Sequence, residues 1–292
     1  MSTISASLVK ELREKTNAGM MECKGALVEA NGDLALAEEI LRKKGIVKAI
    51  NKADREAKDG VVQAALSADG RTGILLEVNC ETDFVSKNES FRGFVDSLAK
   101  VLLEADVADG DTAAFLALAH PAGGTVEEAV KGKIAQIGEN IIARRTARFV
   151  AGPNGRLATY IHMQGRVGVL LEVSAAKPET LVNADVQTAV KDITLHITAA
   201  SPVCIHRDEV PADLAAKERE IYAEQVKDKP AAVIDKIVDG KMVKFYSQVC
   251  LLEQGFVRDP DVTVADHLKA VGAKVGDTIE VVRFKRFAIG QA

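Results

Sequence analysis

The chain has 292 residues, enough for more than one folded unit, and 47% of them are hydrophobic while 27% are charged. Its 38 basic and 42 acidic side chains leave a net charge of −4, which argues against nucleic acid as a direct partner because phosphate binding needs a basic surface. No run of 18 apolar residues is present, and the N-terminus lacks an apolar signal segment. We therefore expect a cytoplasmic protein with no membrane partner.

The cysteines and histidines do not form a recognisable catalytic or metal-binding pattern. Cys23, Cys80, Cys204 and Cys250 lie far apart and include no CxxC pair, so we expect reduced, buried thiols. The five histidines are scattered, and the chain has no GxGxxG or GxxxxGK[ST] sequence. This pattern favours a protein that is not an enzyme and has no cofactor or metal.

Residues 1–45 are predicted to form a compact module of three short helices. Ser5 is placed to cap the first helix and Asp33 the third, while Gly45 is expected to end the third helix. The charged residues 46–59 have little apolar face. We interpret them as a solvated helical connector.

The middle of the chain contains an internal repeat. GRTGILLEVN at 70–79 and GRVGVLLEVS at 165–174 are identical at seven of ten positions. Each copy follows a strand-like stretch with a glycine turn and precedes a stretch with the apolar spacing of a helix. The sequence therefore predicts an α+β fold in which two related core subdomains, residues 60–149 and 150–292, lie side by side.

A helical hairpin is expected as an insertion in the second core subdomain. Two amphipathic segments cover about 211–246 and meet at a polar turn over residues 227–230. Their apolar faces suit two arrangements equally well. The two helices either pack only on each other or form a coiled coil that contacts another chain.

The two copies of the repeat differ directly after the repeated strand. The first copy continues into an acidic and aromatic turn formed by Thr82, Asp83, Phe84 and Val85. The second copy has Pro178 and Glu179 at the places of Asp83 and Phe84. A feature present in only one copy is a candidate for function, because what both copies share is sufficient for the fold.

The local sequence leaves the orientation of Phe84 open. Ser86 to Glu89 has the pattern of a capping box for the next helix, and Thr82 is a competing cap. Phe84 is then either exposed at a corner or folded under its own helix as a hydrophobic staple.

The turn at residues 82–85 resembles the signature of the elongation factor Ts family. Ser7–Arg13 and Ala18–Lys24 are similar to the N-terminal signature of that family. The resemblance runs in order through nearly the whole chain, with further matches at Ile137–Ile141, Tyr160–His162, Lys241–Tyr246 and Val249–Gln254. The last ten residues depart from the pattern, because they lack the acidic ending associated with the family.

The resemblance implies a guanine-nucleotide exchange factor without covalent chemistry. Such a protein binds elongation factor Tu in its GDP-bound and nucleotide-free states, displaces magnesium and promotes GDP release, so that GTP can rebind during translation elongation. The residues 82–85 would carry this displacement. The N-terminal module would resemble a ubiquitin-associated fold, and the expected partner-binding residues are Met20, Met21, Ile137, Gly138 and His162.

Each of these assignments has an alternative. Met20 and Met21 could instead fill the core of the module, and His162 could be an ordinary strand histidine. The hairpin could form a homodimer or a 2:2 complex with the partner, or serve only intramolecular packing. The alternative function is a non-catalytic protein-binding scaffold with a ubiquitin-associated-like module, which would bind without accelerating GDP loss.

Overall fold

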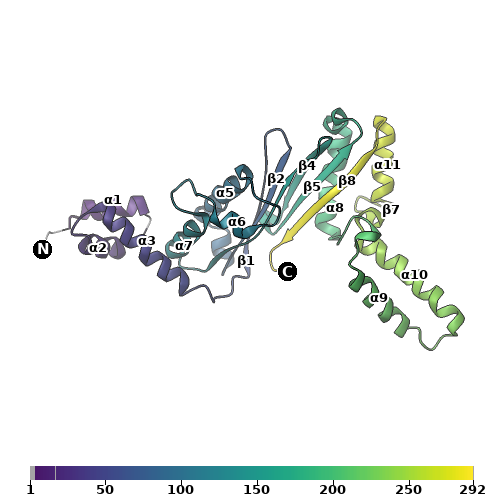
Figure 1. The fold of residues 1–292 in the computed structure, drawn as a ribbon, viewed down its shortest axis with the longest axis horizontal. Helices are drawn as coiled ribbons and strands as arrows, with labels where there is room; N and C mark the ends of the chain where they lie inside the picture. Colours follow the sequence, from purple (N-terminus) through teal and green to yellow (C-terminus); the bar gives the residue numbers. More distant parts are fainter. Residues whose placement is uncertain (1–3, 17, 292) are drawn as a thin grey trace.

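The computed structural model describes residues 4–16 and 18–291. Figure 1 shows an elongated molecule with a helical module at one end, two sheets in the middle and a helical hairpin projecting at the other end. The fold is mixed α+β with small antiparallel sheets, which agrees with the predicted class. No helix among the described residues is long and apolar enough to cross a membrane.

The N-terminal module consists of α1 (Ala6–Thr16), α2 (Met20–Glu29) and α3 (Leu34–Ile50). A small apolar cluster between the helices holds them together, and its fully buried members include Leu12, Cys23 and Leu27. The described members of this cluster include no aromatic side chain.

The prediction that Gly45 ends the third helix is wrong, because α3 continues to Ile50. A Cβ atom at Gly45 would lie 3.2 Å from the Cβ of Ala135 in α7 (Val126–Ile137). The glycine therefore allows α3 to approach α7 closely, and it does not act as a stop signal.

The prediction of a helical connector over 46–59 is also wrong after Ile50, since the chain then forms turns and an irregular stretch before β1. Side chains from the first core subdomain hold this segment. The Asn140 amide donates to the carbonyls of Ala53 and Arg55 at 3.3 and 2.7 Å, and Lys52 donates to the carbonyl of Gly138. These tertiary contacts replace the intrahelical hydrogen bonds that the local charge pattern favoured.

The first sheet has the antiparallel order β1-β2-β3, with β1 (Asp59–Leu66), β2 (Thr72–Cys80) and β3 (Ile141–Val150). Its outer face is covered by α5 (Glu89–Glu104), α6 (Thr112–Ala117) and α7. The second sheet has the order β4-β5-β8, with β4 (Gly155–His162), β5 (Val167–Ala175) and β8 (Ile279–Ala288). Its outer face is covered by α8 (Ala184–Ala200) and α11 (Val264–Val275).

The two sheets pack face to face, so the core has four layers. Leu75 of β2 and Leu170 of β5 lie in the apolar cluster between the sheets. Their neighbours along the strands, such as Leu76 and Leu171, point to the helices on the outer faces. Both faces of each central strand are buried, which explains why apolar residues dominate the repeated segments.

Each repeated segment has a glycine that faces a leucine of the other repeated segment. A Cβ at Gly73 would lie 2.8 Å from Leu170, and a Cβ at Gly168 would lie 3.1 Å from Leu75. Each glycine therefore accommodates a leucine from the other copy. The position of each glycine in its copy is the same, because 73 + 95 = 168.

A buried ion pair is also duplicated. Glu77 is fully buried and binds Arg145 at 2.7 Å, while Glu172 binds Arg283 at 2.6 Å. Each arginine lies over an aromatic ring of the other sheet, Arg145 over Phe287 and Arg283 over Phe149. In both copies the strand register shifts directly after the glutamate.

The hairpin is formed by α9 (Ala212–Glu224) and α10 (Ala231–Val249) and extends away from the sheets in Figure 1. It has an apolar cluster of its own, in which Val238, Met242 and Phe245 are buried. A short pair of strands, β6 (Gly255–Phe256) and β7 (Asp259–Thr263), returns the chain to α11. The hairpin helices are thus stabilised at least in part by packing on each other.

The glycine contacts between the sheets predict a specific loss of stability. Replacing Gly73 or Gly168 with Val places new methyl groups where Leu170 and Val62 already lie, with Cβ distances of 2.8 and 2.5 Å. Overpacking of this kind costs about 1–3 kcal/mol, so we expect each variant to unfold at lower urea concentration than the parent chain.

The matched control is Gly93→Ala on the exposed face of α5, where an added Cβ meets no atom within 4 Å. Alanine favours helix by up to about 1 kcal/mol over glycine, so this variant should be at least as stable as the parent. Urea midpoints of Gly73→Val and Gly168→Val equal to that of the parent would contradict the described sheet packing.

Candidate functional site

The turn at residues 82–85 forms a single-turn helix at the end of β2. Thr82 is extended, with φ −128° and ψ 157°, and α4 (Asp83–Ser86) follows. The predicted capping box beginning at Ser86 is wrong. Asn88 caps α5 instead, accepting hydrogen bonds from the N–H groups of Ser90 and Phe91, whereas the buried Ser86 hydroxyl donates to the Asp83 carbonyl.

Phe84 is the most prominent side chain of this turn, because it is 83% exposed. The staple interpretation therefore does not apply to the free chain. Val85 is partly buried against the core of the first subdomain, and Asp83 accepts a hydrogen bond from Lys87 at 2.7 Å. The turn thus presents an aromatic ring to solvent beside a carboxylate, on an apolar anchor.

Glu139 holds the start of this turn. Its carboxylate accepts hydrogen bonds from the N–H groups of Glu81 and Thr82, each at 3.1 Å, and from the Thr82 hydroxyl at 2.6 Å. Glu139 follows Gly138, whose φ of 90° ends α7. The structure therefore brings Ile137 and Gly138 to the side of Thr82.

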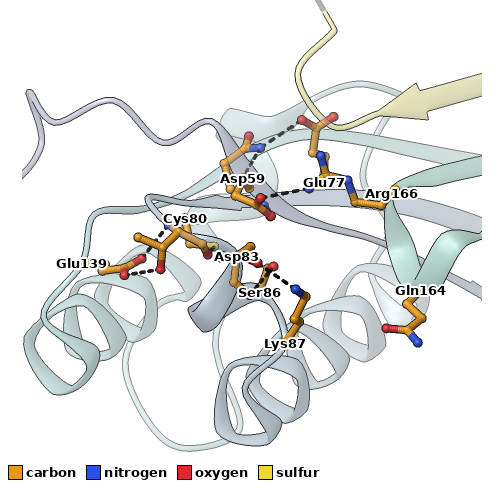
Figure 2. A network of polar contacts seen from close by, with 12 residues as sticks. Asp59, Glu77, Cys80, Asp83, Ser86, Lys87, Glu139, Gln164 and Arg166 are labelled. Atoms are coloured by element: carbon orange, nitrogen blue, oxygen red, sulfur yellow. Dashed lines mark hydrogen bonds and ion pairs between the residues drawn. The ribbon is translucent and has the colours of Figure 1, made fainter.

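A second group of polar contacts, which includes Asp59 and Arg166, lies near the turn (Figure 2). Asp59 binds Arg166 at 2.9 Å, which links the two core subdomains. Partial burial acts to raise the pKa of Asp59, but hydrogen bonds from the Gly60 N–H and from Arg166 act against it, and the pKa of Asp59 is lowered. Burial, together with nearby carboxylates, raises the pKa of the Cys80 thiol to about 12, so this thiol stays protonated.

His162 lies at the end of β4, half-buried, with Nδ1 3.2 Å from the Tyr160 hydroxyl. The chain then turns through Met163 and Gln164, whose φ values of 47° and 55° are unusual for residues other than glycine. Arg92 of α5 donates to the Gln164 carbonyl at 2.8 Å. This contact places the turn after His162 against the same subdomain that holds Phe84.

Met20 and Met21 lie elsewhere, at the start of α2 in the N-terminal module. They are 53% and 77% exposed, so neither fills the core of the module. Met21 lines a surface hollow together with Ala135 and Gln136 of α7, the helix that ends at Ile137. The N-terminal module therefore packs beside the helix that leads to Ile137 and Gly138.

Glu139 is the residue of this site that the sequence did not single out, although it stands in the segment that suggested Ile137 and Gly138. Its role depends on contacts with residues 57 and 58 positions away, which no local pattern shows. Met163 was also missed, and it is 67% exposed beside His162. Among the described residues, no group of three or more His, Cys, Asp or Glu side chains is arranged to hold a metal ion.

A family model described as elongation factor TS matches residues 81–291. The chain is 45% identical over 291 residues to an elongation factor Ts of Halorhodospira halophila, covering 99% of this chain and 93% of that protein. It is 44% and 41% identical to elongation factors Ts of Nautilia profundicola and Clostridioides difficile, each comparison covering all of this chain and 94% of the relative. The chain therefore belongs to the elongation factor Ts family.

Proposed function

We propose that this chain is a guanine-nucleotide exchange factor for elongation factor Tu. It binds the GDP-bound partner, displaces magnesium and promotes GDP release, and it stabilises the nucleotide-free state until GTP rebinds during translation elongation in the cytoplasm. The observation that carries the proposal is Phe84, an aromatic side chain left 83% exposed on a turn that the second copy of the repeat lacks.

The physical basis is linkage between two binding events. A P-loop protein holds GDP through backbone N–H groups and a magnesium bridge. An exchange protein that binds the nucleotide-free partner more tightly than the GDP-bound partner lowers the affinity of the partner for GDP. GDP lowers the affinity of the partner for the exchange protein by the same ratio. No covalent step is needed. An exposed aromatic ring suits this task, because its burial is available only if the partner rearranges to receive it.

The four residues of the turn have different roles in this proposal. Phe84 inserts into the partner, and Asp83 perturbs a magnesium site that depends on charge. Val85 anchors the turn in the core, and Thr82 holds its start through Glu139. We call the Phe84 side chain the wedge. Beside it, the partner also contacts Ile137, Gly138 and His162.

The N-terminal module, residues 1–45, is proposed as a separate docking element of ubiquitin-associated type. The exposure of Met20 and Met21 supports this role, since two flexible apolar side chains at a helix start suit a protein contact. The hairpin of about 211–246 is proposed to support a homodimer or a 2:2 complex. Its exposed Val233 and Val243 offer apolar surface for such a contact.

The wedge proposal predicts that Phe84→Ala impairs exchange far more than folding. Because Phe84 is exposed, truncation removes little core and should leave the melting temperature nearly unchanged. Loss of its burial in the exchange complex forfeits about 1.5–3 kcal/mol, or roughly a 10- to 100-fold slower stimulated GDP release. Stopped-flow release of a fluorescent GDP analogue from elongation factor Tu measures this.

Glu179→Ala is the control, since Glu179 occupies the place of Phe84 in the second copy. This variant should leave the rate of GDP exchange near normal. Asp83→Ala should lose less than Phe84→Ala, because Asp83 is solvated in the free chain. Full stimulation by Phe84→Ala would refute the wedge. Binding of the parent chain to elongation factor Tu without faster GDP release would favour the scaffold function.

The docking proposal predicts that replacing Met20 and Met21 together with Ser weakens association with elongation factor Tu. Two apolar side chains would lose roughly 2–4 kcal/mol of binding at most, while the maximal exchange rate at saturating factor should be largely retained. Titration calorimetry measures the affinity, and circular dichroism checks that the module stays folded. Unchanged affinity of a folded variant would show that this corner does not bind the partner.

A further inference from the structure

Two turns of the first subdomain hold each other through carboxylates, and we call this arrangement the clasp. Glu139 accepts from the N–H groups of Glu81 and Thr82 and from the Thr82 hydroxyl. In return, Glu81 accepts from the N–H of Asn140 at 2.6 Å. Hydrogen bonds to ionised groups are roughly twice as strong as neutral ones, so the clasp joins the end of β2 firmly to the end of α7.

The clasp is continuous with the buried structure below it. Asn140 is buried, and its amide donates to the carbonyls of Ala53 and Arg55. On the other turn, the Cys80 thiol donates to the Thr82 carbonyl at 3.3 Å. Figure 2 shows Glu139 and Asp83 on opposite sides of Cys80.

The second copy has a counterpart of the Glu139 half of the clasp, but it has Ala176 at the place of Glu81 and no aromatic wedge. Asp277 accepts from the N–H of Lys177 at 3.0 Å and from the Thr180 hydroxyl at 2.6 Å. Asp277 lies two residues before β8, as Glu139 lies two residues before β3. Lys177 follows β5 by two residues, as Thr82 follows β2. The two copies therefore share this carboxylate contact, but only in the first copy does it hold a turn that carries an aromatic side chain.

We propose that Glu139 is the positioning residue of the exchange site. By fixing the backbone of residues 81–82, it sets the direction in which Phe84 projects. It also joins the wedge to Ile137 and Gly138, so that both meet the partner as one surface. Glu139 acts through Phe84 and need not touch the nucleotide. This inference rests on the proposed exchange function.

The test is a double-mutant cycle in the full chain, using Phe84→Ala, Glu139→Ala and the two combined. Stimulated GDP release should fall about tenfold or more in Glu139→Ala at saturating factor. The combined variant should be within about twofold of Phe84→Ala alone, since Glu139 has no wedge left to position. Glu139→Gln keeps one acceptor oxygen and should recover part of the rate.

Asp277→Ala is the matched control, because it removes the corresponding carboxylate contacts from the copy without a wedge. It should leave exchange unchanged. Losses that multiply in the combined variant, or full exchange by Glu139→Ala, would overturn the positioning role while leaving the exchange function intact. Failure of the parent chain to accelerate GDP release would instead refute the exchange function, and the positioning role with it.

An independent observation concerns Cys204 and Cys250, whose sulfur atoms lie 3.7 Å apart. Cys204 precedes α9 and Cys250 follows α10, so the two cysteines lie at the base of the hairpin. Backbone hydrogen bonds hold them side by side, including one from the Leu251 N–H to the Cys204 carbonyl at 2.9 Å. Cys204 also lines a surface hollow of about 520 Å³. Lys285 and Arg286 line the same hollow with one carboxylate, that of Glu209. Arg283 also lines it, but its charge is paired with Glu172.

We propose that this pair is a redox-modification site for a small anionic disulfide such as glutathione disulfide. The Cys204 thiolate displaces one thiol from the reagent and forms a mixed disulfide. The Cys250 thiolate then attacks the Cys204 sulfur and displaces the second thiol. The two protein thiols lose two hydrogens, and the reagent is reduced to two thiols. The resulting cross-link ties the feet of the hairpin together.

Burial raises the pKa of both thiols, that of Cys250 to about 12, so we expect oxidation over hours. After incubation with glutathione disulfide, non-reducing peptide mapping should show a Cys204–Cys250 link, with Cys23 and Cys80 unmodified. Trypsin should cleave the oxidised hairpin about fivefold more slowly, because the link limits its opening. Cys204→Ser should abolish both effects. A mixed disulfide without the link, only intermolecular dimers, or no reaction would overturn the proposal.

Discussion

The face-to-face contact between the two sheets is the constraint on which the rest of the structure depends. Buried carboxylates are tolerated only when they are paired, and Glu77 and Glu172 meet this condition through Arg145 and Arg283. Each guanidinium also lies over a phenylalanine ring of the other sheet, at 4.5 Å for Phe287 and 4.1 Å for Phe149. Sliding one sheet on the other would break both arrangements together. The repeat therefore specifies a register as well as two subdomains.

This fixed register places parts of both subdomains around α4. Arg166 of the second subdomain binds Asp59 of the first, and Arg92 holds the backbone carbonyl of Gln164. The left-handed conformations of Met163 and Gln164 each cost roughly 1–2 kcal/mol, so they persist only where the surroundings enforce them. Gly165 helps, because a Cβ there would lie 2.8 Å from Val61 of β1.

The sequence was most informative where a pattern repeats. The shared segments at 70–79 and 165–174 predicted paired strands and an α+β class, and the difference between the copies singled out residues 82–85. It was least informative where tertiary contacts decide. Gly45 has the local features of a stop signal, yet its contact with Ala135 lets α3 continue. The strand that completes the second sheet, β8, lies more than 100 residues after β5 and shares no local signal with it.

The orientation of Phe84 shows why the site in particular was beyond local analysis. A phenylalanine one turn before a helix fits a staple as well as an exposed wedge, and only the backbone position of α4 decides between them. That position is set by Glu139, which is distant in sequence. A rigid base matters for binding as well. When the backbone is already ordered, docking needs to fix only the torsions of the ring, so less of the burial energy is lost to ordering. The exposed aromatic ring and the clasp below it are therefore two parts of one requirement.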